Sequence, residues 1–289
     1  MKVARCPTEL GDDARRAVAI GTFDGVHLGH RRVLDAAREA GGKPTAVTFW
    51  PHPRLAFGHQ VELLTTLERR LELLEEAGIE DALVVEFDLG LARLEPEEFA
   101  ERYLRPIGAE TVVAGADFRF GRERRGDLEL LSRLGFDARP VPLLEGVSSS
   151  QIRHLARAGD VAGAAWMLGR PFEVDGTVVS GDRRGGTLGF PTANLAVDPA
   201  LLVPCYGIYA GSADGHRAAV SIGVNPHYGG EERKIEAFLL DFDSDLYGRR
   251  LVVELWERLR EERAFESEAD LIEQIARDVE ATRAARRPR

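Results

Sequence analysis

Hydrophobic residues in the first half of the chain come in short runs, separated by stretches with helical spacing. The runs that have the length of buried strands are Ala17–Ile20, Thr45–Phe49, Leu83–Phe87, Thr111–Ala114 and Ala138–Leu143. Between them, Arg31–Ala40 is amphipathic, leucines recur on one face of Val61–Ala77, and a further helix is predicted from Pro96 onward. This alternation predicts an α/β fold, with a parallel sheet covered by helices on both faces.

The pattern changes after residue 168. Strand-like runs now follow one another with only Gly, Asp and Asn turns between them, at Phe172–Val179, Tyr206–Ala210, Ala218–Val224, Ile235–Asp241 and Leu251–Leu255. They predict an antiparallel sheet or small barrel, closed by a terminal helix over Leu271, Ile275 and Val279. We therefore expect two domains, residues 1–168 and 169–289, with a frayed basic tail at Arg283–Arg289.

Charge and cysteine content narrow the class of protein. The formal net charge is −10, whereas proteins that bind extended nucleic acid usually present a broad basic face. Cys6 and Cys205 lie far apart, so the sequence predicts neither a disulfide framework nor a zinc ribbon. No apolar run has the length of a membrane span or of a signal peptide core. We expect a cytoplasmic protein with no nucleic-acid or membrane partner, as a monomer or weak homo-oligomer.

The first predicted strand runs directly into GTFDGVHLGH, at residues 21–30, and a helix follows. Backbone N–H groups and the positive end of the helix dipole at such a junction favour a polyphosphate. Two imidazoles there can neutralise charge on a departing pyrophosphate, and a glycine between them lets the backbone approach the ligand. The residues that we assign to ATP and its phosphates in this segment are Gly21, Phe23, Asp24 and Gly29, with His27 and His30 as catalytic groups.

Three further motifs follow later strands: PHP at 51–53, GADFRFG at 115–121 and SSSQIR at 148–153. Carboxyl ends of parallel strands meet at one edge of a sheet, where ligands bind, so we expect these motifs to share a site. Each has a structural alternative when taken alone, such as a rigid turn or a helix cap. A zinc site at His27, His30, His52 and His59 is a further alternative, although no acidic or cysteine ligand stands at a metal-like spacing.

Together these four segments resemble the adenylyltransferase module of the prokaryotic bifunctional riboflavin kinase/FAD synthetases, a Rossmann-like nucleotidyltransferase domain. The resemblance implies that His27 and His30 hold ATP phosphates and that Ser149, Ser150 and Arg153 belong to a phosphate-binding segment. It also implies that His52, Asp117 and Arg119 line the nucleotide and FMN site. The HxGH signature is shared with class I aminoacyl-tRNA synthetases, so a transfer-RNA ligase is an outside alternative.

The second domain opens with a glycine-rich segment, GDRRGGTLGFPTANL, at residues 181–195. Its glycines allow a loop to fold against phosphates, and Thr192 and Asn194 offer the neutral oxygens that Mg²⁺ accepts. Taken alone, the segment favours a mobile hairpin with an Asn turn. Together with GRPFEVDG before it and KIEAFLLD after it, it resembles the riboflavin kinase module, a β-barrel.

That second resemblance implies that Glu236 is the general base, that Thr192 and Asn194 bind Mg²⁺ and phosphate, and that Gly186 and Gly189 contact ATP. One departure is His227–Tyr228, which stands where the family usually has Thr–Phe. The implied reactions are phosphorylation of riboflavin to FMN and adenylylation of FMN to FAD, with ATP as co-substrate and the flavins as products rather than prosthetic groups. The alternatives are a single-activity FMN adenylyltransferase with a flavin-binding barrel, and a non-enzymatic flavin-binding protein.

Overall fold

The computed structural model describes residues 1–11, 13–181, 189–225 and 232–288. The chain divides into two compact units, of which the first comprises Met1–Val61 and Leu67–Val147. The second comprises Glu62–Thr66 and Ser148–Arg289, so a short segment from the first half of the sequence belongs to it. The domain boundary expected near residue 168 falls inside the second unit, and it stays a prediction.

The first unit is built on a six-stranded parallel sheet with the order β1-β4-β3-β2-β5-β6. Its strands are β1 (Lys2–Ala4), β2 (Arg16–Ile20), β3 (Lys43–Trp50), β4 (Asp81–Glu86), β5 (Ala109–Gly115) and β6 (Asp137–Val141). The predicted parallel sheet is therefore confirmed, with β1 as an additional edge strand. The direction in which strands are added reverses between β2 and β5, and this reversal is where open α/β sheets form a ligand crevice.

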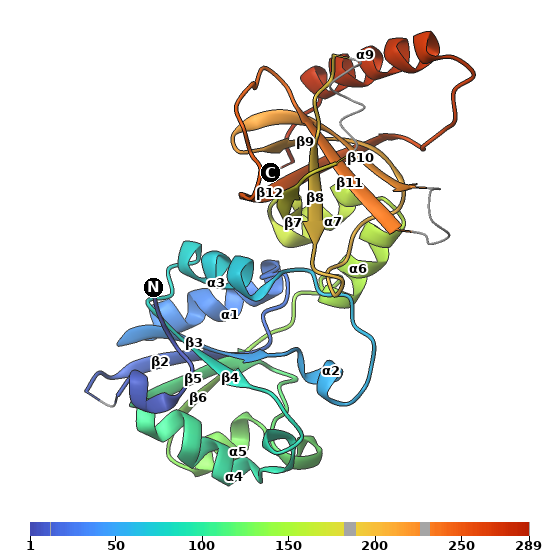
Figure 1. The fold of residues 1–289 in the computed structure, drawn as a ribbon. Coiled ribbons are helices and arrows are strands. Elements are labelled where there is room, and N and C mark those ends of the chain that lie inside the picture. Colours follow the sequence, from blue (N-terminus) through green and yellow to red (C-terminus); the bar gives the residue numbers. More distant parts are fainter. Residues whose placement is uncertain (12, 182–188, 226–231, 289) are drawn as a thin grey trace. The chain divides into compact units, whose positions relative to one another are not determined.

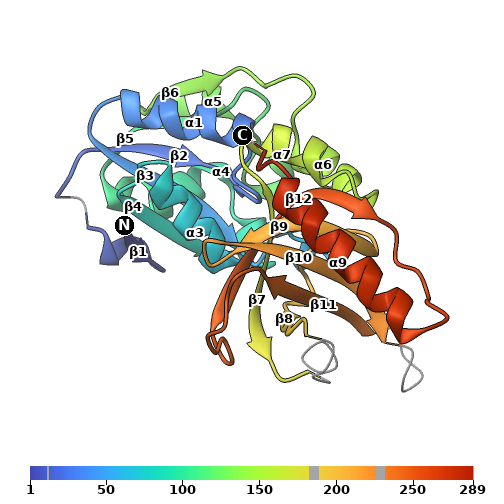
Figure 2. The same cartoon turned by 90° about the horizontal axis from the view of Figure 1, so that it is seen from above.

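Helices cover both faces of this sheet, as the alternation predicted (Figures 1 and 2). Ala19, Ala46 and Val113 share a core with residues of α1 and α3, whereas Val18, Val47 and Val112 share the opposite core with Phe99 and Leu104. The helices are α1 (Leu28–Glu39), α2 (Pro53–Ala56), α3 (Leu67–Glu76), α4 (Pro96–Phe99) and α5 (Leu128–Arg133). Shorter helical turns lie at Pro7–Glu9, Leu91–Arg93, Ala100–Leu104, Arg105–Ile107 and Arg122–Arg124.

The helix expected over Val61–Ala77 is wrong in its first turns, because α3 begins only at Leu67. Leu63 lies instead in an extended segment, where its N–H donates to the carbonyl of Ala200 (2.6 Å) and its carbonyl accepts from the N–H of Leu202 (2.8 Å). These strand-like hydrogen bonds satisfy the main chain that a helix would have satisfied. Pairing with a distant segment has overridden the local leucine spacing.

The second unit is a closed antiparallel barrel with the strand order β10-β11-β8-β7-β12-β9, as predicted. Its strands are β7 (Phe172–Val179), β8 (Ala193–Val197), β9 (Gly207–Ala213), β10 (His216–Asn225), β11 (Glu232–Leu239) and β12 (Arg250–Arg260). The helices α6 (Ser149–Arg157) and α7 (Val161–Leu168) precede it, and α9 (Glu268–Ala284) follows it. Strand β8 was not anticipated as a strand, since its sequence suggests a hairpin turn.

One hydrophobic core joins the barrel to α6 and α7. Buried barrel residues such as Val174, Val220 and Val253 belong to the same cluster as helix residues. The helix residues in that cluster are Ile152, Ala156, Val161, Ala164 and Leu168. These two helices therefore pack as part of the barrel unit.

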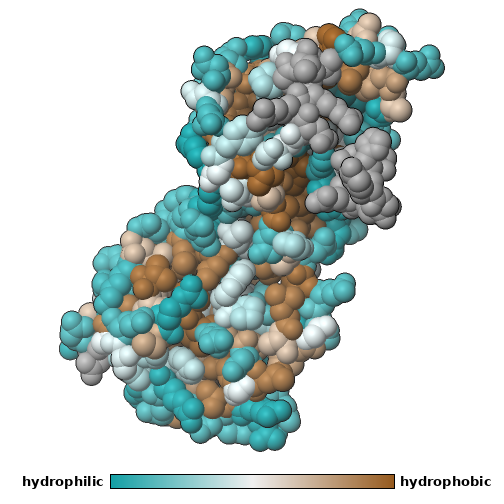
Figure 3. All heavy atoms as spheres, viewed as in Figure 1, coloured by the Kyte–Doolittle hydropathy of each residue, from teal (hydrophilic) through white to brown (hydrophobic). Residues whose placement is uncertain are grey.

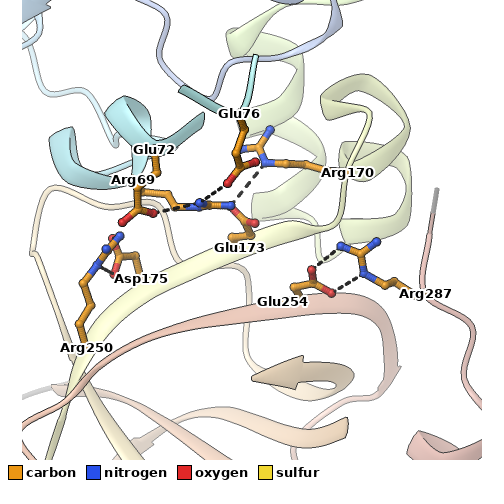
Figure 4. Close-up of polar contacts among 9 residues, drawn as sticks. All are labelled: Arg69, Glu72, Glu76, Arg170, Glu173, Asp175, Arg250, Glu254 and Arg287. Atoms are coloured by element: carbon orange, nitrogen blue, oxygen red, sulfur yellow. Dashed lines mark hydrogen bonds and ion pairs between the residues drawn. The ribbon is translucent and has the colours of Figure 1, made fainter. Parts of the chain in front are cut away.

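The expectation of a frayed tail at Arg283–Arg289 is wrong for the described part of that segment. Arg283 pairs with Asp241 (2.8 Å), and Arg287 forms a two-point pair with Glu254 on β12 (2.6 and 2.8 Å; Figure 4). Ala285 between them is only 5% exposed. The arginines that made the segment look solvated are the groups that bind it to the barrel unit.

No helix within the described ranges combines the length and apolarity needed to cross a membrane. On the face drawn in Figure 3, hydrophilic residues predominate along the edges of each unit, and hydrophobic residues are visible inside those edges. The large exposed hydrophobic side chains, among them Phe57, Leu143 and Trp166, come from separate segments of the chain.

Candidate functional site

The segment between β2 and α1 has an unusual backbone conformation. Phe23 (φ 50°) and Val26 (φ 38°) lie in the left-handed region although neither is glycine, and both side chains are buried. The hydroxyl of Thr48, on β3, donates to the carbonyl of Thr22 (3.0 Å). Strained residues of this kind persist only where their surroundings over-determine them, and they concentrate at functional sites.

The two histidines of HxGH lie together at the start of α1. His27 is the N-cap residue, and its Nδ1 accepts from the N–H of His30 (3.2 Å). The imidazole rings stack with centroids 3.6 Å apart and planes 17° from parallel. A methyl group at Gly29 would lie 3.1 Å from Cε1 of His27, so the glycine leaves room for that ring. The histidines thus form one stacked imidazole pair at the positive end of a helix.

Asp24 of the same segment faces the protein interior. Its carboxylate is 1% exposed and pairs with Arg70 of α3, which is fully buried (3.5 Å). Arg70 also donates to the carbonyl of Phe49 (3.3 Å), and its guanidinium carbon lies 5.3 Å from the ring centre of Trp50. The assignment of Asp24 to ATP stays a prediction, and its burial favours an indirect role.

Arg70 was missed in the sequence because LERRLELL is typical of an exposed, charged helix face. The available signal was its spacing, three residues after Leu67 and four before Leu74, which puts it on the apolar face.

The PHP and GADFRFG motifs follow β3 and β5, the two neighbours of β2 in the sheet. His52 is 9% exposed and caps α2, with its Nδ1 accepting from the N–H of Arg54 (3.2 Å). Asp117 and Arg119 are exposed, and Arg119 donates to the carbonyl of Phe118 (2.9 Å). Since these strands are parallel and adjacent, the structure brings three of the four predicted motifs to one edge of the sheet.

The fourth motif belongs to the second unit. Ser148 caps α6 by accepting from the N–H of Gln151 (3.2 Å), and Ser149 and Ser150 form the first turn of that helix. Arg153 is 8% exposed, and its Nε donates to the carbonyl of Glu62 (2.7 Å). The assignment of Ser149, Ser150 and Arg153 to the ATP site stays a prediction.

Glu236 and Asn194 are direct neighbours in the barrel, because β11 and β8 pair with these two residues opposite each other. Ile235, Ala237 and Leu195 belong to the barrel core, so Glu236 and Asn194 both project from the outer face of the sheet. A methyl group at Gly181 would overlap the side-chain amide of Asn194, which therefore packs directly on the Gly181 main chain.

A pocket of about 930 Å³ opens beside Asn194. Gly181, Leu201, Tyr206 and Arg233 also line it, together with Lys234. The Arg233 guanidinium donates to the carbonyl of Val203 (3.1 Å) and lies 5.4 Å from the ring centre of Tyr206. One wall is thus polar and cationic, which suits a phosphorylated ligand.

Thr192 and Gly189 lie on the described segment just before β8, with Gly189 exposed in the left-handed region (φ 87°). Gly186, His227 and Tyr228 lie outside the described residues. Across the residues that are described, no three His, Cys, Asp or Glu side chains gather as a metal would require, so the zinc alternative gains no ligand set. The oxygens of Thr192 and Asn194 are of the type that Mg²⁺ accepts.

Two family models match the chain. One, described as "FAD synthetase", covers residues 10–162, and the other, described as "Riboflavin kinase", covers residues 168–286. They correspond to the two resemblances found in the motifs.

Relatives of known name match nearly the whole chain. A protein of Listeria monocytogenes named "Bifunctional riboflavin kinase/FMN adenylyltransferase" is 34% identical, covering 96% of this chain and 94% of its own. A protein of the same name from Escherichia coli strain K12 is 36% identical, covering 90% of each chain. A Streptococcus pneumoniae crystal structure titled as a macrolide-efflux protein has a TM-score of 0.88 and 29% identity, over 97% of this chain and 98% of that one.

Proposed function

The chain belongs to the bifunctional riboflavin kinase/FMN adenylyltransferase family, and on that premise we propose which of its residues carry each reaction. It is a transferase that converts riboflavin to FMN and FMN to FAD, with ATP as substrate in both steps. We assign the kinase reaction to the barrel unit and adenylyl transfer to the parallel-sheet unit.

In the kinase reaction, the carboxylate of Glu236 accepts the proton of the ribityl 5′-hydroxyl while that oxygen attacks the γ-phosphorus of ATP, and ADP leaves. The observation that carries this assignment is the register between β11 and β8, which sets Glu236 opposite Asn194, a residue of the pocket lining. Thr192 and Asn194 would hold Mg²⁺, which neutralises phosphate charge when bound. Arg233 and Lys234 offer cations in the same pocket.

In adenylyl transfer, a phosphate oxygen of FMN attacks the α-phosphorus of ATP and pyrophosphate leaves. The nucleophile is already ionised, so no protein base is needed, and catalysis depends on orientation and on donors to the departing charge. The stacked pair His27 and His30 at the start of α1 supports that role. We assign His52, Asp117 and Arg119 to the flavin and nucleotide.

The test is chromatographic. Purified protein is incubated with riboflavin, ATP and Mg²⁺, and FMN and FAD are followed over time beside Glu236→Ala and His27→Ala/His30→Ala variants. The wild-type protein is expected to accumulate FMN and then FAD. The Glu236→Ala variant should leave riboflavin unchanged but still convert supplied FMN to FAD, and the double histidine variant should stop at FMN.

Each variant controls for the folding of the other, because the two substitutions lie in different units. If wild-type protein converts supplied FMN but not riboflavin, the barrel is not a working kinase, and the single-activity adenylyltransferase alternative is favoured. If it converts neither flavin, the activities proposed here are wrong. Replacing Mg²⁺ by excess chelator should abolish phosphorylation of riboflavin. If phosphorylation continues without Mg²⁺, the proposed role of the metal is wrong.

We also propose that the protein acts in the cytoplasm on free flavins and not on nucleic acid. The net charge of −10 disfavours a polyanionic partner. Filter binding with total RNA tests the transfer-RNA alternative, and sedimentation at several concentrations tests the expected monomer or weak homo-oligomer.

A further inference from the structure

The buried residue Arg70 connects the two strand ends that carry the histidine motifs of the first unit. Through Asp24 it contacts the segment that follows β2, and through the carbonyl of Phe49 it contacts the end of β3. We propose that Arg70 is a positioning residue for adenylyl transfer, which holds the segment bearing His27 and His30 against the strand that leads to His52. This inference rests on the proposed function, since it concerns the same reaction.

The conformation of residues 22–26 explains why such a connection is needed. Phe23 and Val26 hold left-handed backbone angles, which non-glycine residues adopt only at a cost in energy. Asp24 lies between them, and its carboxylate pairs with Arg70 of α3. Because His27 directly follows Val26, a small shift of this segment moves both imidazoles relative to the bound triphosphate.

The chemistry of arginine suits this role. Its planar guanidinium can pair with Asp24, donate to a carbonyl and lie near the Trp50 ring at the same time, whereas a lysine presents a single ammonium. Burying such a pair is costly and is weak evidence for stability alone. Because Arg70 contacts two strand ends, its contacts favour a role in positioning the segment that bears His27 and His30.

The same unit contains a second buried Arg–Asp pair, which serves as a matched control. Arg16, at the start of β2, is 3% exposed and pairs with fully buried Asp81 at the start of β4 (3.1 Å). Arg16 also donates to the carbonyl of Ile107 (2.6 Å). This pair lies at the amino edge of the sheet, opposite the edge that carries the histidines. Asp81 is also paired with Lys43 (2.8 Å), and a substitution of Arg16 disturbs a buried Arg–Asp contact without touching the site.

The experiment compares Arg70→Lys with Arg16→Lys in the full chain. Both variants are expected to lower the thermal stability of the first unit. Only Arg70→Lys should lower the kcat of FMN adenylylation, by roughly tenfold to a hundredfold, with KM values for FMN and ATP changed less than about threefold. Riboflavin phosphorylation, measured on the same samples, should remain at the wild-type rate in both.

Trp50 gives a separate readout of folding in the first unit, since the other tryptophans, Trp166 and Trp256, lie in the second. In protein labelled with 5-fluorotryptophan, ¹⁹F NMR should show one folded Trp50 resonance in Arg70→Lys, at a shifted position. Arg70→Gln, which keeps a donor but no charge, is the second variant and should lose more kcat than Arg70→Lys.

Several results would overturn the proposal. One is a wild-type adenylylation kcat in folded Arg70→Lys and Arg70→Gln. Another is an equal loss of kcat in Arg16→Lys. A third is a loss of kcat in the Arg70 variants that is proportional to the fraction of unfolded protein in the Trp50 signal. Failure of both Arg70 variants to fold would also overturn it. If instead wild-type protein makes no FAD from FMN, the proposed function itself is wrong and the inference falls with it; this result is seen in the wild-type sample and so differs from a defect confined to the Arg70 variants.

Discussion

At the scale of single residues, Gly29 is the clearest test of the histidine pair. A methyl group there would approach the His27 ring to 3.1 Å, closer than ordinary packing allows. Alanine also favours a helix by about 1 kcal/mol over glycine, which offsets the strain of displacing the His27 cap, so Gly29→Ala should leave the stability of α1 nearly unchanged. We expect adenylylation to fall about tenfold, while thermal stability stays close to that of the wild type, as measured by FAD formation and calorimetry. An unchanged adenylylation rate would mean that the His27 ring position is not critical.

Gly181 supports the corresponding test in the barrel. A methyl group at this position would overlap the Asn194 amide, which must then rotate away from its place opposite Glu236. Gly181→Ala is expected to lower riboflavin phosphorylation and to raise the Mg²⁺ concentration needed for half-maximal rate. Adenylylation of supplied FMN should be unaffected, and Gly29→Ala serves as the reciprocal control. If riboflavin phosphorylation by Gly181→Ala has the wild-type Mg²⁺ dependence, Asn194 does not bind the metal.

Individual residues also mark the limit of what the sequence could predict. The HxGH spacing and the GADFRFG motif could be predicted from the residues to share one edge of the sheet, whereas Asn194 and Glu236 were assigned only through the family resemblance. Arg70 was not predicted, because its spacing on the apolar face of α3 is a weaker signal than the charged sequence around it, which is typical of an exposed helix. Burial depends on which face the sheet covers, and that is decided by residues far away in sequence.

At the scale of elements, the end of α9 is fastened to the barrel unit by ion pairs. Arg260 of β12 makes a two-point contact with Asp278 (2.8 and 3.0 Å), and Arg287 makes another with Glu254 (Figure 4). Replacing Arg287 by Gln should cost about 1 kcal/mol of unfolding free energy, because the arginine is more than half exposed while its partner Glu254 is largely buried. Denaturant unfolding measures it, with exposed Arg133→Gln in the first unit as a control expected to be nearly neutral.

The Arg287–Glu254 contact also predicts a pH dependence. Burial raises the pKa of Glu254, but hydrogen bonds from Arg287, Trp256 and Ser212 outweigh it, so the pKa lies below its usual value. A lowered carboxylate pKa contributes stability that is present above the unfolded pKa, near 4.3, and is lost as the pH falls through the folded value. The stability difference between wild type and Arg287→Gln should therefore be full at pH 7 and shrink below about pH 4. A constant difference would contradict an ionic contact.

The elements themselves were largely predictable where the local sequence is apolar. Strands β2, β3 and β5, which are buried on both faces, and the barrel strands other than β8 follow apolar runs, so local sequence was enough to predict them. The first turns expected before α3 were not, because the main chain at Leu63 pairs with residues 200–202, and β8 was hidden in a sequence rich in turn residues. Both failures involve hydrogen bonds between segments far apart in the chain.

At the scale of the whole molecule, the sequence motifs and the compact units divide the chain differently. The motifs and family models divide it in the 160s, whereas the compact units divide after Val147, with Glu62–Thr66 joined to the second. The hydroxyl of Thr66 donates to Asp175 (2.6 Å), which in turn pairs with Arg250 through both oxygens. The barrel unit therefore uses residues that precede it in sequence.

A pair of fragments tests this division. Residues 148–289 retain α6 and α7, whereas residues 169–289 lose Ile152, Ala156, Val161, Ala164 and Leu168 from the barrel's hydrophobic core. Since burying one large aliphatic side chain contributes roughly 1.5–3 kcal/mol, the shorter fragment should melt at a clearly lower temperature and lose kinase activity sooner on warming. Both fragments lack Glu62–Thr66, so neither should reach the stability of the barrel unit in the full chain. Equal melting temperatures for the two fragments would mean that the helices are only attached to the barrel, and that the boundary near residue 168 describes the folding unit better.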